Sequence, residues 1–495
     1  MSETFRNPFI YADVPDPAVI RVGDTYYMTS TTMYFTPGCP VMKSKDLVNW
    51  EIVNYVYDTL SDNDHMVMRN GKHDYGKGSW ASSLRYHNGT FYVSFVAYNT
   101  GKTYVFQTED IENGPWRKHE IEGIYHDMSL LFDDDGRVYM VYGAGAIKLI
   151  ELTADATAIK PGGLNKIIIE HADITGGKSL AEGAHLYKID GKYYIFIIAW
   201  PRTGTGRRIE ICYRADSIDG EYQGKIVLDD DLGFRNAGVA QGGIVDTPDG
   251  KWYAMLFQDH GSVGRIPVLV PVCWQDGWPI FGIDGKVPIE MPYPTKPYPT
   301  AALVVSDDFN GDKLPLQWQW NHNPDNTGWC LNSRRGWLRL TTTHIAQNLV
   351  EARNTLTQRT YGPVCSGSVL LDTSQMKNGD YAGLAALAEH YGFVGVKMED
   401  GCKHVVMAKA PGTTEVETVP LSQDTVQLKI DFNFTDAIDE ANFYYSLCGT
   451  VWHRIGDTLK MRYTLAHFTG YRFALFNYTT KTPGGYADFD WFKLG

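Results

Sequence analysis

The sequence predicts an all-β protein, made of a five-bladed β-propeller followed by a β-sandwich. Short runs of β-branched and aromatic residues, each bounded by Gly, Asp, Asn or Pro, dominate the 495 residues, and such runs are typical of strands joined by turns. No long segment shows the 3.6-residue periodicity of an amphipathic helix. A turn followed by an aromatic strand recurs five times in the first part of the chain, whereas the last part alternates without that repeat.

The repeated unit is a turn of the Asp/Asn/Gly type followed by a strand that opens with aromatic residues. Asn-Gly and Asp-Gly suit a type I′ hairpin turn, in which both central residues need positive φ. The turn glycines are separated by 66, 47, 55 and 59 residues, enough for a four-stranded sheet in each repeat, and five such sheets around an axis form a propeller. The copies are "GDTYYMTS" from Gly23, "NGTFYVSF" from Asn88, "DGRVYMVY" from Asp135, "DGKYYIFI" from Asp190 and "DGKWYAML" from Asp249.

The domain boundaries follow from where the repeat ends. It fades after Trp278, and the segment Glu290–Val305 contains four prolines, which predict a stiff, extended connection. Alternating strands such as "GWLRLTT", "GSVLLDT" and "VQLKIDF" follow, as in a β-sandwich. We therefore expect a propeller over residues 1–295, a linker at about 296–305 and a sandwich over residues 306–495.

Charge and cysteine content limit the classes of function. The chain has 45 Lys and Arg against 58 Asp and Glu, a net charge of −13, which argues against nucleic acid or an anionic membrane as a partner. The most apolar run, Tyr193–Trp200, is far shorter than the about 18–20 residues that span a bilayer. Seven scattered cysteines show no zinc-ligand spacing and the N-terminus shows no secretory signal, so we expect a cytoplasmic protein.

Three acidic residues occupy equivalent places in their repeats. Asp16 in "VPDPAVI", Asp127 in "YHDMSLLF" and Glu182 in "LAEGAHLY" each precede an apolar run, and they stand 11, 12 and 12 residues before the tyrosine that follows the hairpin turn. The first hairpin is one residue shorter, and such closely matching offsets in a repeat place the three at a similar depth in the central channel. Any one of them could cap a turn or pair with a buried arginine, but three at one depth suit glycoside hydrolysis, which needs carboxylates around one cavity.

The motifs resemble those of glycoside hydrolase family 43, the β-xylosidase and α-L-arabinofuranosidase group. The resemblance covers essentially the whole chain and implies a propeller with a C-terminal concanavalin-like β-sandwich. It rests on "DVPDPAVIRVGDTYYM", "HDMSLLFDDDGRVYMVYG", "EGAHLYKIDGKYYIF", "GGIVDTPDGKWYAM" and "GRIPVLVPVCWQDGWPIFG" in the propeller, and on "DDFNGDKLPLQWQWNHNPDNTGWCL" and "NTLTQRTYGP" in the tail.

The resemblance implies a role for each carboxylate. Asp16 corresponds to the general base, Asp127 to the residue that orients the acid and tunes its pKa, and Glu182 to the general acid. Members of the family invert configuration, so the carboxyl groups of Asp16 and Glu182 are expected about 6.5–9.5 Å apart, with water between them. The apolar setting of Glu182 in "SLAEGAHL" independently favours a protonated acid, as would an ionised Asp127 beside it.

The resemblance also implies substrate contacts. Trp80 corresponds to a pocket tryptophan whose ring can stack on a sugar, although a core tryptophan would give the same pattern. Arg265 matches the pocket arginine. Met33 and Tyr34 in "STTMYFTPG" fall in the family's substrate-contacting loop, where packing within the blade is the alternative. Gln241, which stands where many members have histidine, is assigned to substrate binding.

A metal site is a further implication of the resemblance. Members of the family commonly hold Ca²⁺ on the propeller axis with one histidine and several waters, which suits a hard cation that prefers oxygen. His260 in "FQDHGSVGR" corresponds to that histidine. The alternative is that His260 only forms hydrogen bonds in the channel.

The predicted function is that of an inverting exo-glycosidase that releases terminal α-L-arabinofuranosyl residues, with some β-D-xylosidase activity, from arabinoxylan or its oligosaccharides. The preference for arabinose rests on Ser82 and Ser83, which stand where the family pattern "WAPDL" has an acidic residue, and whose small size would open the pocket rim. A β-D-xylosidase acting on xylo-oligosaccharides is the alternative within the family. A non-catalytic carbohydrate-binding propeller is the alternative of another class.

Overall fold

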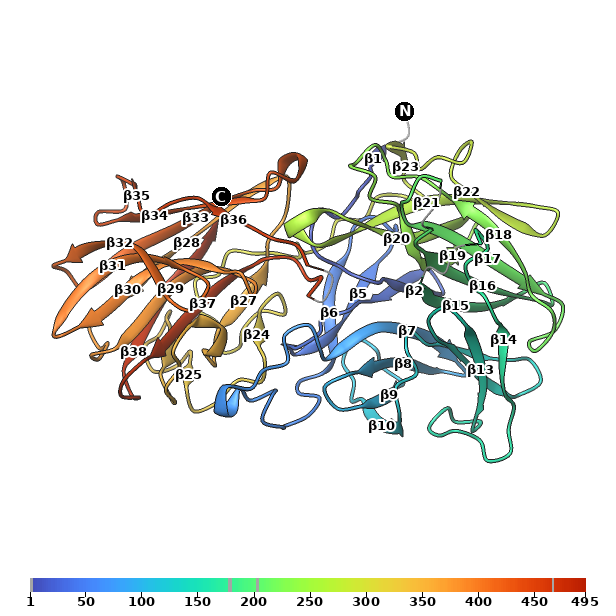
Figure 1. Cartoon of the computed structure of the whole chain (residues 1–495), viewed down its shortest axis with the longest axis horizontal. Coiled ribbons are helices and arrows are strands. Elements are labelled where there is room, and N and C mark those ends of the chain that lie inside the picture. The colour runs from blue at the N-terminus through green and yellow to red at the C-terminus, as the bar shows by residue number, and fades with distance from the viewer. Residues whose placement is uncertain (1–2, 177–179, 202–203, 465–466) are drawn as a thin grey trace.

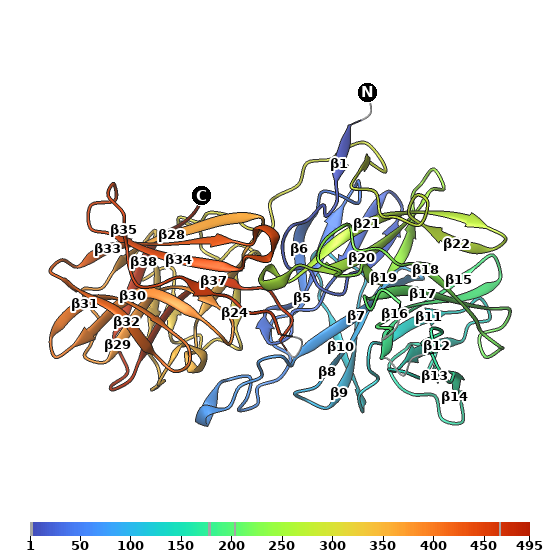
Figure 2. The same cartoon turned by 45° about the horizontal axis from the view of Figure 1, so that its top comes forward.

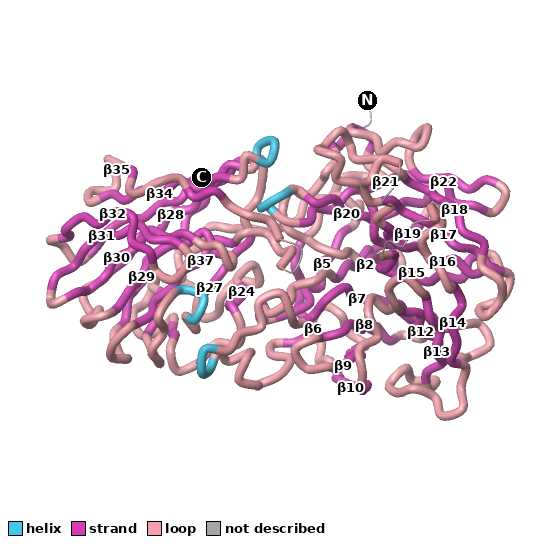
Figure 3. The backbone as a smooth tube through the Cα atoms, viewed as in Figure 1, coloured by secondary structure: helices cyan, strands magenta, loops and turns pink. Residues whose placement is uncertain are grey.

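The computed structural model describes residues 3–176, 180–201, 204–464 and 467–495, and it contains two β domains that lie side by side (Figure 1). Strands make up nearly all of its regular structure (Figure 3), which confirms the predicted all-β class. The helical segments in these ranges are four turns of three residues, η1 (Arg69–Gly71), η2 (Gly261–Val263), η3 (Leu349–Glu351) and η4 (Thr435–Ala437). None of the described helical turns is long or apolar enough to cross a bilayer.

The N-terminal domain is the predicted propeller, with five four-stranded antiparallel sheets in the described residues. The first strands of the five blades contact one another in a closed ring, so they form the inner wall. The blades are β2 (Ala18–Val22), β3 (Thr25–Thr29), β5 (Gly38–Ser44) and β6 (Glu51–Tyr57); β7 (Ser79–His87), β8 (Thr90–Ala97), β9 (Lys102–Thr108) and β10 (Arg117–Glu122); β11 (Ser129–Phe132), β12 (Val138–Tyr142), β13 (Ile147–Leu152) and β14 (Asn165–Ile169); β15 (Ala181–Ile189), β16 (Lys192–Ala199), β17 (Ile209–Ala215) and β18 (Gln223–Leu228); and β19 (Ala240–Asp246), β20 (Trp252–Asp259), β21 (Arg265–Gln275) and β22 (Trp278–Phe281).

The hairpin turns of the blades confirm only part of the predicted turn chemistry. Asn88–Gly89 and Asp190–Gly191 have positive φ at both residues, as a type I′ turn requires. In the first blade only Gly23 has positive φ, 64°, which suits a type II′ turn with glycine at its first central position. The third and fifth blades use five-residue loops, 133–137 and 247–251, in which the glycine alone is left-handed.

The N-terminal segment closes the ring of blades. Strand β1 (Thr4–Arg6) pairs with β23 (Glu290–Pro292) beyond the fifth blade. Figure 1 shows both near the N-terminus, and Figure 2 shows β1 there from a second direction. The side chain of Asn7 donates to Leu269 O at 2.8 Å and accepts from Leu269 N at 3.1 Å. These bonds fix the start of the chain against β21, so the first and last blades stay adjacent.

The C-terminal domain packs two sheets around its main hydrophobic core, and the propeller contributes a strand to one of these sheets. Strand β4 (Phe35–Thr36), from the first blade's loop, pairs with β24 through Trp320 and Asn321. One sheet in the described residues is β32 (Thr414–Leu421), β31 (Cys402–Lys409), β30 (Gly392–Glu399), β29 (Asp380–Leu387), β37 (Arg472–Thr479), β27 (Leu356–Arg359), β24 (Gln319–Asn321) and β4. The other is β25 (Trp329–Cys330), β26 (Leu338–Thr341), β38 (Tyr486–Leu494), β28 (Val364–Asp372), β33 (Thr425–Asn433), β34 (Glu440–Ser446) and β35 (His453–Arg454), with β36 (Leu459–Lys460) beside β34.

The connection between the domains is packed against the propeller. Thr295 donates its hydroxyl to Lys45 O at 3.0 Å, and Tyr298 N donates to the carboxylate of Asp46 at 2.7 Å. These contacts bind the proline-rich segment to the first blade. The exact domain limits, 1–295 and 306–495, stay a prediction.

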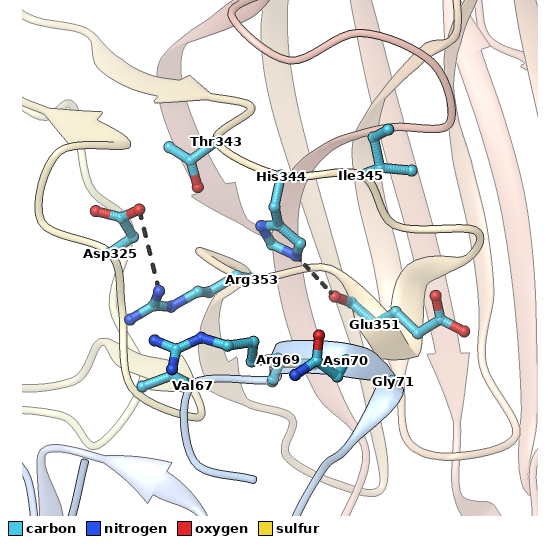
Figure 4. Close-up of a pocket in the computed structure, with 11 residues that line it drawn as sticks. Val67, Arg69, Asn70, Gly71, Asp325, Thr343, His344, Ile345, Glu351 and Arg353 are labelled. Carbon is cyan, nitrogen blue, oxygen red and sulfur yellow. Dashed lines mark hydrogen bonds and ion pairs between the residues drawn. The ribbon is translucent and has the colours of Figure 1, made fainter. Parts of the chain in front are cut away.

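A second bridge is the loop of residues 58–78 between β6 and β7, which reaches the sandwich. Asn323 N donates to Met66 O at 2.9 Å, and Asp74 N donates to His322 Nε2 at 2.9 Å. Between this loop and the sandwich lies a hollow of about 430 Å³, the interdomain cavity (Figure 4). It is lined by Val67, Met68, Arg69, Asn70, Gly71, Asp325, Thr343, His344, Ile345, Glu351 and Arg353.

Candidate active site

A smaller cavity of about 260 Å³, the propeller pocket, lies where the inner strands of the propeller begin. All five blades contribute to its wall, and one side chain comes from the sandwich. It is lined by Asp16, Trp80, His126, Asp127, Leu180, Glu182, Trp200, Gln241, Arg265 and Phe468. The structure therefore brings together six of the residues predicted from the sequence: Asp16, Trp80, Asp127, Glu182, Gln241 and Arg265.

The backbone departs from regular strand geometry where it delivers these side chains. Asp16, Asp127 and Gln241 have left-handed φ values of 51°, 47° and 59°, and β15 has a bulge between Glu182 and His185. A left-handed conformation costs a non-glycine residue about 1–2 kcal/mol, and a bulge re-aims a side chain. Strained backbone that gathers around one cavity is typical of a functional site.

Asp16 is buried and has both carboxylate oxygens engaged. Arg265 Nη1 donates to Oδ1 at 2.6 Å, and the hydroxyl of Thr31 donates to Oδ2 at 2.5 Å. Arg265 is itself held by Asp259 at 3.2 Å and by the ring of Phe468, whose centroid is 3.7 Å from the guanidinium carbon. Arg265 and Thr31 therefore hold the carboxyl group of Asp16 in a fixed orientation, which suits a base that accepts a proton from water.

Glu182 forms a hydrogen bond with a histidine that the sequence analysis missed. His126 Nε2 lies 2.8 Å from Glu182 Oε2, and His126 Nδ1 lies 2.8 Å from the hydroxyl of Tyr98. Burial lowers the pKa of His126, but the carboxyl groups of Asp127 and Glu182 outweigh that effect and raise it to about 9. A histidine directly before Asp127 was the one available signal for this contact.

Asp127 is the carboxyl group of the propeller pocket whose pKa is raised by its surroundings. Burial, together with the neighbouring charges of Glu182 and Asp16, raises the pKa of Asp127 to about 7, although His126 and Arg265 act in the opposite sense. Two of the pocket's titratable groups, Asp127 and His126, thus have pKa values displaced toward or beyond neutrality. Such displacement within one cleft is typical of acid–base catalysis.

Aromatic side chains complete the wall. Trp80 meets Phe468 edge to face, with 5.5 Å between ring centroids, and its indole N–H donates to Gly76 O at 3.2 Å. Trp200 and Leu180 also line the pocket. Apolar rings beside carboxylates are suited to a sugar, which has both C–H faces and hydroxyls. Phe468 comes from the loop before β37 of the sandwich, so no pattern within the propeller repeat could have indicated it.

Met33 and Tyr34 are not among the residues that line the propeller pocket. They pack between the domains, in a buried cluster that also contains Phe468 and Tyr75. The hydroxyl of Tyr34 lies 2.6 Å from His467 Nε2. The pairing of β4 with β24 draws this loop toward the sandwich, so these side chains support the wall from behind.

Ser82 and Ser83 are also absent from the pocket lining. Both are buried: Ser82 Oγ lies 2.8 Å from Thr29 Oγ1, and Ser83 Oγ accepts from Leu130 N at 3.1 Å. They join the second blade to its neighbours. The expected opening of the pocket rim at these positions therefore has no basis in the structure.

His260 lies beside a different hollow, next to Tyr11 and Phe234. Its Nε2 is 2.7 Å from Gln258 Oε1 and its Nδ1 is 3.2 Å from the hydroxyl of Tyr11. Both ring nitrogens thus have protein partners, which does not suit a metal ligand, and burial lowers the pKa of this imidazole to about 4. The calcium site stays a prediction.

One set of side chains in the described part of the chain has three potential ligand atoms within 4.8 Å of one another: His126, Asp127 and Glu182. The hydrogen bond between His126 and Glu182 accounts for this proximity without an ion.

Comparison with known families separates a glycoside hydrolase from the alternative of a non-catalytic carbohydrate-binding propeller. The model of glycosyl hydrolases family 43 matches residues 5–279, and that of the beta xylosidase C-terminal concanavalin A-like domain matches residues 306–494. The chain belongs to glycosyl hydrolase family 43. It is a glycoside hydrolase, which confirms the resemblance seen in its motifs, and the second match confirms the concanavalin-like type of the C-terminal domain.

Individual members of the family show how much of the chain is shared. A beta-xylosidase of Formosa agariphila is 32% identical over 99% of this chain and 90% of its own length. A non-reducing end alpha-L-arabinofuranosidase of Bacteroides ovatus is 34% identical over 69% of this chain and 66% of its own length. The solved structure of a bifunctional GH43-CE protein of Bacteroides eggerthii superposes with a TM-score of 0.95 at 52% identity, and the present chain, covered completely, spans 64% of it.

Proposed function

We propose that this glycoside hydrolase is an inverting, exo-acting pentosidase that removes terminal xylosyl or arabinofuranosyl residues from arabinoxylan-derived oligosaccharides. The observation that carries the proposal is the arrangement of three carboxyl groups in one small pocket, each with a different partner. Asp16 is paired with Arg265, Glu182 is bonded to His126, and Asp127 is buried beside them. Two carboxyl groups with opposite tasks are what glycoside hydrolysis requires.

Each residue then has one task in a single displacement. Asp16 accepts a proton from the attacking water as its oxygen bonds to the anomeric carbon. Glu182 donates a proton to the leaving oxygen as the glycosidic bond breaks. Asp127, whose carboxyl group lies within 4.8 Å of that of Glu182, orients the acid. General acid–base catalysis of this kind contributes about 10²–10⁴-fold for each group.

The pocket also supports the choice of a pentose. Trp80, Phe468 and Trp200 surround a space of about 260 Å³, and a pentose lacks the exocyclic carbon that a hexopyranose would have to fit against these rings. The pocket is built from all the blades and covered by the sandwich side chain Phe468, which suits the end of a chain rather than its middle.

Of the two activities, we propose that β-D-xylosidase is the stronger and α-L-arabinofuranosidase the weaker. The argument for arabinose depended on Ser82 and Ser83, which are buried away from the pocket. The Formosa relative named beta-xylosidase matches nearly the whole chain. The Bacteroides relative named alpha-L-arabinofuranosidase supports arabinofuranosidase as the second activity, and differences of this size in a pocket are often worth only about 1–3 kcal/mol.

A panel of 4-nitrophenyl glycosides tests the proposal. The β-D-xylopyranoside and the α-L-arabinofuranoside should be hydrolysed, and a β-D-glucopyranoside should not. NMR during early turnover should show the anomer opposite to that of the substrate appearing first. Release of the retained anomer would overturn the single displacement and the role of Asp16. A k_cat/K_M for the arabinofuranoside more than tenfold above that for the xyloside would reverse the order of the two activities.

A further inference from the structure

The general acid of the proposed mechanism stands at the end of a chain of three side chains. Glu182 Oε2 is 2.8 Å from His126 Nε2, and His126 Nδ1 is 2.8 Å from the hydroxyl of Tyr98. The ring of Tyr98 packs against Trp80, with 4.9 Å between centroids, and Tyr98 is 40% exposed. Tyr98 follows β8, His126 precedes β11 and Glu182 lies on β15, so three consecutive blades meet in this chain.

We propose that His126 is a positioning residue that shares one proton with Glu182 and returns it for the acid step, while Tyr98 fixes the imidazole in place. The proposal rests on the proposed function, in which Glu182 protonates the leaving oxygen. It adds a residue to the acid half of the reaction and leaves the base half, Asp16 with Arg265, unchanged.

The proton balance of the chain is simple. In the imidazolium form, Nε2–H donates to Glu182 Oε2 and Nδ1–H donates to the oxygen of Tyr98. Transfer of the Nε2 proton to Glu182 gives a neutral imidazole and a carboxylic acid, and the bond from Nδ1–H to Tyr98 remains. The carboxylic acid then gives its proton to the glycosidic oxygen, which takes the electron pair of the breaking C–O bond. Asp16 then releases to the solvent the proton that it took from the attacking water, and the neutral imidazole regains a proton from the solvent.

The charges around His126 favour this role. Asp127 stands next to it in the chain, Glu182 faces it from β15, and Asp16 faces it from the segment before β2. Their carboxyl groups raise the pKa of His126 against the effect of burial. Arg265, another cationic side chain of the pocket wall, is already paired with Asp16 at 2.6 Å. Asp127 and His126 both have displaced pKa values. His126 is the one of the two that is hydrogen-bonded to Glu182, so it can exchange a proton with the acid directly.

If His126 had only a structural role, its replacement would change different kinetic constants. Loss of packing against Trp80, whose ring centroid is 6.1 Å from that of His126, would distort the sugar site and raise K_M for every substrate. Loss of a proton partner of Glu182 would instead act on k_cat, and mainly for leaving groups that need protonation.

The test compares His126→Gln and Tyr98→Phe with the wild-type full-length protein. His453→Gln, an exposed histidine of β35 in the sandwich, is the matched control. Two glycosides of the preferred pentose are used, with 4-nitrophenol and with methanol as leaving groups. For His126→Gln we expect k_cat to fall about 10–100-fold with methanol and less than about threefold with 4-nitrophenol, with K_M within about twofold. Tyr98→Phe should act in the same direction and more weakly.

A double-mutant cycle with Glu182→Ala separates the two interpretations. If His126 acts through Glu182, His126→Gln should cause no further loss in the Glu182→Ala background. Additive losses, or equal losses with both leaving groups, would overturn the proposal. If His126→Gln does not fold by circular dichroism, Tyr98→Phe decides alone, because it keeps the ring and removes only the hydroxyl. Failure of the wild-type protein on every pentoside would overturn the proposed function itself, which is a distinct result.

Discussion

The propeller pocket and the interdomain cavity differ in an instructive way. The interdomain cavity is larger, at about 430 Å³ against about 260 Å³. Its charged groups find partners at its own rim: Arg69 pairs with Asp64 at 3.2 Å, and Arg353 donates to Asn323 O at 2.9 Å and lies 4.0 Å from Asp325. Figure 4 shows Arg353 and Asp325 joined in this way.

In the propeller pocket, by contrast, carboxyl groups lie close to one another and repel. Three carboxyl groups share one arginine and one histidine, so burial and mutual repulsion raise the pKa of Asp127 to about 7 and the carboxyl groups raise that of His126 to about 9. Volume therefore does not identify the candidate active site. Left-handed backbone does not identify it either, because Met68 and Asn70 of the interdomain cavity have positive φ, as Asp16 and Asp127 do. The displaced pKa values of Asp127 and His126 do.

The largest difference between the two cavities should appear when carboxyl groups are removed. Asp16→Ala and Glu182→Ala should each lower k_cat on xylobiose by about 10²–10⁴-fold. Glu182→Ala should matter less for 4-nitrophenyl glycosides, because 4-nitrophenolate needs little protonation to leave. Asp325→Ala in the interdomain cavity is the matched control and should stay near wild-type k_cat. Equal losses for aryl and natural glycosides would show that Glu182 is not the acid.

The next difference concerns the apolar side chains that the sandwich gives to each cavity. Phe468 covers Arg265 and meets Trp80 in the propeller pocket, whereas Ile345 of the interdomain cavity is 52% exposed. Phe468→Ala should lower k_cat/K_M by about 10–100-fold, since it exposes the Arg265–Asp16 pair to water and removes part of the sugar wall. Ile345→Ala should have little effect. Equal values for the two variants would show that the sandwich has no part in catalysis.

The repeat in the sequence accounts for what could be predicted. Because Asp16, Asp127 and Glu182 stand at nearly equal offsets, 11, 12 and 12 residues, from the tyrosine after the hairpin turn, their meeting in one pocket could be predicted from the blade repeat. Trp80 and Gln241 begin inner strands in the same way. A repeat of this kind determines how far along the propeller axis each residue lies. Residues of different blades that lie at the same level meet in the central channel.

The misplaced and missed residues share a physical cause, which is contact between the domains. Phe468 reaches the pocket from the sandwich. Tyr34 lies outside the pocket, because the pairing of β4 with β24 holds its loop against the sandwich. Neither contact has a signal in the periodicity of either domain. Ser82 and Ser83 illustrate a second limit: alternation cannot tell whether a small polar residue faces the pocket or bonds a neighbouring strand, as these two do.

Replacing an aspartate by asparagine should change the melting temperature in opposite directions in the two cavities at neutral to alkaline pH. Burial raises the pKa of Asp127 above its unfolded value of about 4, so ionisation costs the folded state stability as pH rises toward 7. Asp127→Asn should therefore melt higher than wild type above about pH 7, with no advantage below about pH 4. In Asp325, burial is outweighed by hydrogen bonds such as that from Thr327, which lower the pKa, so Asp325→Asn should melt lower at neutral pH. Melting curves of both variants between pH 4 and 9 give the comparison, and a loss of stability in Asp127→Asn at pH 8 would contradict it.

The smallest expected effect is on catalysis when the arginines of the interdomain cavity are changed. Arg69 is largely exposed and its ion pair with Asp64 is worth about 0–1 kcal/mol. Arg353 holds the main-chain oxygens of Asn323 and Pro324, so its removal should cost about 1 kcal/mol of stability for each lost bond. Neither group touches the propeller pocket, so k_cat/K_M on xylobiose should change by less than about twofold in Arg69→Ala and Arg353→Ala, whereas Arg265→Ala should be strongly impaired. A tenfold loss in either of the first two variants, in protein that still melts cooperatively, would break the comparison, because the interdomain cavity would then take part in substrate binding.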